Sequence, residues 1–95
     1  MTNAERASVL RRAAELVERG WCQHSWKHGN LVCLAEAVGS ALDSIAPHMG
    51  FSELQVLYDK IDPYSSLVAW NDAPGRTQAE VVALLRDAVR ELEGE

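Results

Sequence analysis

The sequence predicts an all-α fold: one domain over residues 1–95, built as a compact bundle of four main helices and one short helix, with no sheet. Three observations lead to this prediction. Apolar residues recur with the 3.6-residue period of a helix in several segments. No segment shows the sustained alternation of a strand. Hydroxyl residues followed three positions later by Glu or Gln mark helix starts. Short connections between the segments favour antiparallel or near-orthogonal packing around one core.

The first helix is predicted over residues 3–19, with Thr2 and Glu5 forming a capping box at its start. Gly20 follows the last turn and is expected to end the helix as a C′ glycine. Residues 21–30 then form a loop. The second helix is predicted over residues 31–46, because apolar residues follow the helical period there.

The third helix is predicted over residues 53–61, with Ser52 and Gln55 as a second capping box. Asp62 and Pro63 predict the N-cap and first position of a short helix that ends at Trp70. The remaining elements are a loop over residues 71–76 and a last helix over residues 78–93, opened by a third capping box of Thr77 and Glu80.

Charge and composition exclude several classes of function. Nine basic residues stand against fourteen acidic ones, and no basic patch is visible, so we expect no direct binding to nucleic acid. No apolar run has the length of a membrane helix, and the N-terminus lacks a signal-peptide core. We therefore expect a cytoplasmic protein without membrane contact, in which Cys22 and Cys33 are free thiols.

Unusual chemistry gathers in the loops on either side of the middle helices. The candidate binding residues are Trp21, Cys22, Gln23, His24, Trp26, Trp70, Asn71, Asp72 and Arg76. Tryptophan anchors many protein interfaces, but it also covers the ends of small bundles. We expect Trp21 and Trp70 to be buried, and Trp26 to be exposed.

Four soft ligands lie within twelve residues of one another: Cys22, His24, His28 and Cys33. Such a set can hold tetrahedral zinc, although this spacing matches no specific zinc module. The alternative is two packed thiols and two loop histidines, and we expect neither a metal nor a cofactor.

A thiol site is a further hypothesis. Cys22 would be the nucleophile, His24 or His28 the base, and Asn71 or Asp72 the orienting group. However, Cys22 follows a helix instead of opening one, so the helix dipole would not lower its pKa.

Asn71, Asp72 and Arg76 have two interpretations. They form either the polar floor of a pocket or the turn chemistry of a loop, in which Arg76 pairs with Asp72 or with a helix end.

Three sequence stretches resemble a family of small proteins from actinobacteria and their phages, classed as a domain of unknown function. They are Arg-Gly-Trp-Cys-Gln at 19–23, Val-Cys-Leu-Ala-Glu-Ala-Val at 32–38 and Trp-Asn-Asp-Ala-Pro-Gly-Arg-Thr-Gln-Ala-Glu-Val at 70–81. The resemblance covers most of the chain and departs after Cys33, where the family has Ala and Gly. It implies a lineage but no activity. It also implies that the Trp-Cys-Gln and Trp-Asn-Asp motifs meet, with Gln23 and Asn71 in mutual contact.

We therefore expect a non-enzymatic, small acidic helical protein that acts by contact with a protein partner, as a monomer or a homodimer. It would be a phage-derived or accessory factor, with the loops over residues 21–30 and 71–76 as its contact surface. The alternative is a small-molecule or metal-binding protein that uses Cys22, His24, His28 and Asp72. A third hypothesis is a thiol-dependent enzyme.

Overall fold

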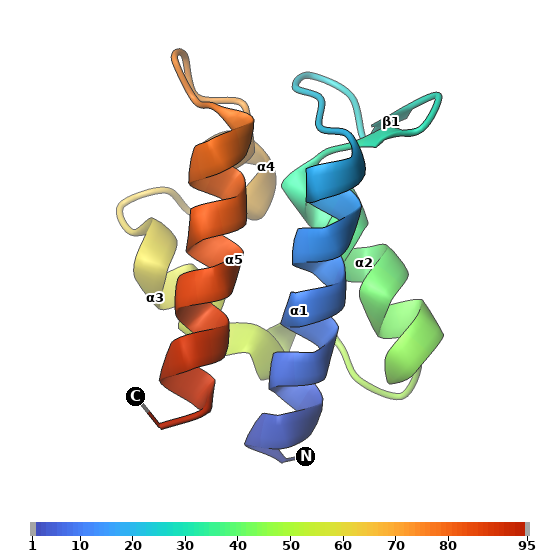
Figure 1. Ribbon diagram of the computed structural model, residues 1–95. Coiled ribbons are helices and arrows are strands. Elements are labelled where there is room, and N and C mark those ends of the chain that lie inside the picture. The colour runs from blue at the N-terminus through green and yellow to red at the C-terminus, as the bar shows by residue number, and fades with distance from the viewer. Residues whose placement is uncertain (1, 95) are drawn as a thin grey trace.

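A computed structural model describes residues 2–94 and confirms the predicted helical fold (Figure 1). In chain order the elements are α1 (Asn3–Arg19), β1 (Lys27–His28), β2 (Leu31–Val32), α2 (Leu34–Ile45), the 3₁₀ helix η1 (Phe51–Leu54), α3 (Gln55–Ile61), α4 (Leu67–Asn71) and α5 (Gln78–Leu92). Within the described residues, no helix has the length and apolar character needed to cross a membrane.

The helices α1 and α5 lie side by side and antiparallel at the centre of the molecule (Figure 1). The helix α2 packs against α1, while α3 packs against α5. The facing surfaces are apolar and fully buried, with Leu10 and Val17 on α1 and Val81 and Leu85 on α5. Each such side chain contributes about 1.5–3 kcal/mol when it leaves water, so this pair of helices forms the centre of the core.

Two of the three predicted capping boxes are confirmed. The Glu5 amide donates to the Thr2 hydroxyl over 3.1 Å, and the Glu80 amide donates to the Thr77 hydroxyl over 3.2 Å. The box at Ser52 is wrong, because η1 already begins at Phe51 and its start has no side-chain cap. Gln55 donates its side-chain amide to Asp59 instead.

The predicted helix start at Asp62 is also wrong. Asp62 ends α3 with an extended backbone (φ −49°, ψ 134°), the conformation that a following proline favours. The short helix α4 begins at Leu67, where the Ser66 hydroxyl accepts a hydrogen bond from the Ala69 amide over 3.0 Å. It therefore covers Leu67–Asn71 and not residues 63–70.

A small antiparallel hairpin corrects the prediction of a fold with no sheet. Lys27 pairs with Val32, and His28 pairs with Leu31. Because its strands have only two residues each, the hairpin leaves no alternation in the sequence. Because β2 occupies residues 31 and 32, the second helix starts at Leu34 and not at residue 31 as predicted. Cys33 caps this helix, as its sulfur accepts a hydrogen bond from the Glu36 amide over 3.4 Å.

Gly20 joins the end of α1 to this hairpin. Gly20 directly follows Arg19, the last residue of α1, as predicted, although its backbone is extended (φ 172°) and not left-handed as is usual for a C′ glycine. A Cβ atom at this position would lie 2.6 Å from Cδ2 of Leu31. The Gly20 carbonyl accepts a hydrogen bond from the Val32 amide, and the Cys22 amide donates to the Val32 carbonyl, each over 3.1 Å. Glycine therefore permits the close approach of α1 and β2.

Candidate functional site

The side chain of Asn71 is fully buried at the end of α4 and connects three segments. Its Oδ1 accepts from Nε1 of Trp21 over 2.7 Å and from the Leu34 amide over 3.0 Å. Its Nδ2 donates to the Cys22 carbonyl over 3.1 Å and to Oδ1 of Asp72 over 2.9 Å. One amide thus meets its full bonding capacity and fixes the first loop, the start of α2 and the end of α4 together.

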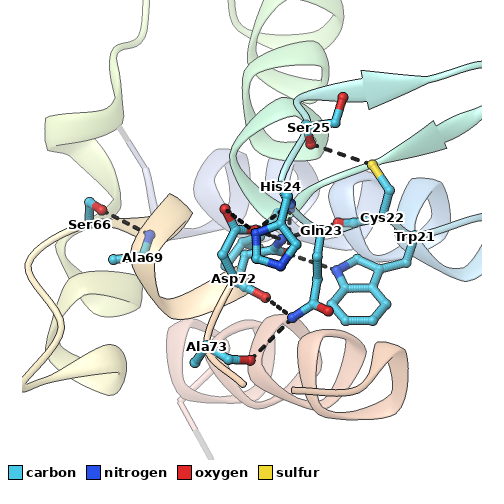
Figure 2. Close-up of polar contacts among 11 residues, drawn as sticks. Trp21, Cys22, Gln23, His24, Ser25, Ser66, Ala69, Asp72 and Ala73 are labelled. Carbon is cyan, nitrogen blue, oxygen red and sulfur yellow. Dashed lines mark hydrogen bonds and ion pairs between the residues drawn. The ribbon is translucent and has the colours of Figure 1, made fainter. Parts of the chain in front are cut away.

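Two further contacts attach the first loop to the segment after α4 (Figure 2). Nε2 of Gln23 donates to the carbonyls of Asn71 and Ala73, over 3.0 and 3.2 Å. The backbone amide of His24 donates to Oδ1 of Asp72 over 2.9 Å. The predicted contact between Gln23 and Asn71 is therefore confirmed.

The three tryptophans occupy different environments. Trp70 is buried, as predicted, whereas Trp21 is only half-buried. The prediction for Trp21 is wrong in degree, because its indole stays near the surface while its N–H reaches inward to Asn71. Trp26 is 58% exposed, which confirms the prediction for that residue.

Arg76 supports the buried face of Trp70. Its guanidinium carbon lies 3.8 Å from the centroid of the Trp70 ring, and its Nε donates to the Trp70 carbonyl over 2.9 Å. Its Nη1 lies 3.6 Å from a carboxylate oxygen of Glu80. Of the two predicted pairings, Arg76 therefore makes the contact with a helix end and not the one with Asp72.

The four soft ligands do not form a metal site. Among residues 2–94, no three His, Cys, Asp or Glu side chains are arranged to hold a metal ion. Cys33 is buried and caps α2, while Cys22 donates its thiol to the Ser25 carbonyl over 3.4 Å. His24 and His28 are exposed in the loop and the hairpin.

The chemistry of Cys22 also differs from that of a nucleophile. Burial raises the pKa of the Cys22 thiol, and the nearby Cys33 and Asp72 raise this pKa further. A raised pKa leaves little thiolate at neutral pH, and the thiolate is the reactive form. A backbone hydrogen bond with His28 acts in the opposite direction but does not cancel the rise of the pKa. The thiol donates to the Ser25 carbonyl, and no hydrogen bond joins it to a histidine side chain among the described residues.

The environment of Asp72 keeps this carboxyl group ionised. Burial by itself would raise its pKa, but hydrogen bonds from the His24 amide and the Asn71 side chain, together with the adjacent His24 imidazole, bring the pKa below its usual value. Nδ1 of that imidazole lies 3.9 Å from Oδ2 of Asp72. The Asp72 side chain is 24% exposed, so the charge is accessible to solvent.

Two hollows flank the exposed indole of Trp26. A polar hollow of about 310 Å³ is lined by His24, Ser25, Trp26, Cys33, Val68 and Asp72. An apolar hollow of about 220 Å³ is lined chiefly by Trp26, Ala35, Phe51, Tyr58, Leu67 and Val68. Trp26 and Val68 line both hollows, so the indole forms a ridge between them. We call this whole area the Trp26 surface.

The sequence did not point to the apolar half of the Trp26 surface. Phe51, Tyr58 and Leu67 line this half, and none of them is among the candidate binding residues predicted from the sequence. For the polar half one signal was available, since Val68 and Asp72 are four residues apart and therefore share a helical face.

His24 has a strained backbone at the edge of the polar hollow. Its φ of 63° is the only positive value at a non-glycine residue within the described residues. Such a conformation costs free energy and persists where surrounding contacts fix it. The hydrogen bond from the His24 amide to Asp72 is such a contact.

The fold and this site define a class of protein: a small helical protein whose most distinctive surface is an exposed tryptophan between two hollows. The chain belongs to a family of unknown function, DUF6197, whose family model matches residues 1–91. No curated protein and no solved structure matches the chain. The membership confirms the resemblance to a family of unknown function.

Proposed function

We propose that this protein is a non-enzymatic interaction module that binds a segment of another protein across the Trp26 surface. The observation that carries the proposal is the 58% exposure of the Trp26 indole between two hollows. A tryptophan buries a large area on contact, and tryptophans dominate the binding energy of many protein interfaces. An indole held in water between concave surfaces is suited to this role.

Preorganisation of the loop supports the same proposal. The Trp26 carbonyl accepts a hydrogen bond from the Cys33 amide over 3.1 Å, which joins the indole-bearing residue to the start of α2. On its other side, the loop is held by the contacts of Gln23 and His24 with the segment after α4. A surface that is already ordered loses little conformational entropy on binding, so more of the contact energy appears as affinity.

The distribution of charge supports a basic partner. Asp72 is the one carboxylate among the described residues that line the two hollows, and neither lining includes Lys or Arg. The chain as a whole carries a net charge of −5. Complementary charge speeds association and selects among partners. We therefore propose that the bound segment carries a large apolar side chain, which enters the apolar hollow, near basic residues.

A randomised peptide library displayed on yeast or phage tests this function. We expect the protein to enrich peptides with a large apolar residue close to Lys or Arg. Trp26→Ala should weaken binding of the enriched peptides about tenfold or more, as for a central interface tryptophan. Ile45→Ala is the matched control, because Ile45 is 42% exposed at the end of α2 and lines neither hollow.

Two results would contradict the proposal. One is the absence of any enriched peptide. The other is equal affinity of the wild-type protein and Trp26→Ala for the enriched peptides. Circular dichroism should show that both variants keep the helical fold, because each replaced side chain is largely exposed.

We also propose a lineage and a cellular compartment for this protein. The sequence motifs support an accessory protein of actinobacterial or actinophage lineage that acts in the cytoplasm. The polar hollow is the one observation that favours the alternative of a small-molecule-binding protein.

A further inference from the structure

We infer that the polar hollow beside Trp26 binds a cationic side chain, a lysine ammonium or an arginine guanidinium, from the protein partner. Asp72 would be its counter-ion and the Trp26 ring its aromatic wall. This inference rests on the proposed function and specifies what the partner presents next to its apolar residue.

The carboxylate of Asp72 is oriented, with one oxygen unused. Oδ1 accepts two hydrogen bonds, from the His24 amide and from Nδ2 of Asn71, each over 2.9 Å. Oδ2 accepts none from the described residues, and Nδ1 of the His24 imidazole lies 3.9 Å from it. Figure 2 shows this carboxylate beside the His24 ring. A charged acceptor that is fixed through one oxygen leaves the other for a donor from outside.

The remaining lining fits the rest of a long cationic side chain. The face of an indole attracts a cation through its negative electrostatic potential. Val68 and Cys33 add apolar surface, against which the methylene stem of lysine or arginine can pack. The same chemistry already operates nearby, where the Arg76 guanidinium lies over the Trp70 ring.

The test uses two matched probes and the protein over residues 1–95, labelled with ¹⁵N. The first probe is Nα-acetyl-lysine methylamide, and the second is the norleucine analogue, which has a straight alkyl chain without the ammonium group. The readout is the indole N–H signal of Trp26, assigned by its absence in Trp26→Phe. At about pH 8, where an ordinary imidazole is neutral, we expect saturable shifts with the lysine probe. The affinity for the norleucine probe should be lower by about fivefold or more. Added salt should lower the affinity for the lysine probe only.

Asp72→Asn is the decisive variant. An asparagine at this position retains an oxygen that can accept from His24 and Asn71, so the loop keeps its hydrogen bonds while the charge is lost. We expect its affinity for the lysine probe to fall about tenfold, the loss of one charge-assisted contact. Asp43→Asn is the matched control, because Asp43 is an exposed carboxylate on α2 outside the hollow. An unchanged Trp21 indole signal, which reports the bond to Asn71, shows that the loop is intact.

A second variant keeps the inference testable if Asp72→Asn disturbs the loop. Trp26→Leu retains apolar surface but has no aromatic face. Because this variant has no Trp26 indole signal, binding is read from the backbone amide signals of His24 and Ser25, which line the same hollow. Trp26→Leu should weaken binding of the lysine probe and leave binding of the norleucine probe almost unchanged. Equal affinity of the two probes for the wild-type protein, or equal effects of Asp72→Asn and Asp43→Asn, would overturn the inference.

The outcomes separate this inference from the proposed function. If library peptides depend on Trp26 but not on Asp72, the interaction module stands and the cation site is wrong. If the lysine probe binds through Asp72 while no peptide is enriched, the cation site stands and the protein-binding function is wrong. That second result would identify a protein that binds small amines.

Discussion

Asn71 replaces water for three polar groups that the fold removes from solvent. Its side chain forms hydrogen bonds with the Leu34 amide, the Cys22 carbonyl and the Trp21 indole N–H. Leaving a buried donor or acceptor without a partner costs about 1–3 kcal/mol for each group. Among side chains of this size, only asparagine carries both a two-proton donor and a two-lone-pair acceptor. The sequence identified Asn71 as a turn residue but not as a buried one, since its partners are distant in the chain.

Replacing Asn71 by alanine should therefore destabilise the whole protein. We expect Asn71→Ala to lower the free energy of unfolding by about 3 kcal/mol, because water entering the space can satisfy only part of the network. Urea denaturation followed by tryptophan fluorescence measures this change. Ser44→Ala, at an exposed position on α2, is the control and should change stability by about 0.5 kcal/mol or less. A loss below about 1 kcal/mol for Asn71→Ala would contradict the account.

At the scale of single elements, local signals predicted most of the fold, and tertiary contacts explain the exceptions. The capping boxes at Thr2 and Thr77 involve residues three positions apart and open long helices, so the sequence was sufficient. At Ser52 the same pattern gave the wrong answer. The Phe51 ring packs beside Gly39 of α2. A Cβ atom added at Gly39 would lie 3.5 Å from Cζ of Phe51. This contact favours a turn that starts at Phe51 and excludes Ser52 from the cap.

Paired substitutions at the two hydroxyl residues test this difference. Thr77→Ala removes the acceptor for the Glu80 amide and should lower the free energy of unfolding by about 1 kcal/mol. Ser52→Ala removes no cap and should change it by about 0.5 kcal/mol or less. Urea denaturation of both variants in the same buffer gives the comparison. Equal losses at the two positions would mean that Ser52 caps a helix after all.

At the scale of the whole molecule, two carboxyl groups make the free energy of unfolding depend on pH in the acidic range. Hydrogen bonds from Thr2 lower the pKa of Glu5. At Asp72, burial would raise the pKa, but the hydrogen bonds from His24 and Asn71 outweigh it and lower the pKa in the folded state. A pKa that is lower when folded means that the unfolded chain binds the proton more tightly. The stabilisation is therefore present above the unfolded pKa, about 4, and is lost as pH falls through the folded value.

We expect Asp72→Asn to flatten the acid branch of this dependence. Between about pH 5 and pH 2, the free energy of unfolding of the wild-type protein should fall more steeply than that of the variant. Urea denaturation at a series of pH values measures both curves. Asp43→Asn should retain the wild-type slope, because Asp43 is exposed and forms no hydrogen bond or ion pair through its side chain among the described residues. Parallel curves for the wild-type protein and Asp72→Asn would show that Asp72 does not contribute.

The antiparallel pairing of α1 and α5 places the start of one helix and the end of the other at the same pole of the molecule (Figure 1). The loop that bears Trp26 follows the opposite end of α1. A helix of 17 residues separates the two poles by about 25 Å. A linker or an affinity tag joined before α1 or after α5 would therefore lie at the pole opposite the loop that follows α1, about one helix length away from that loop.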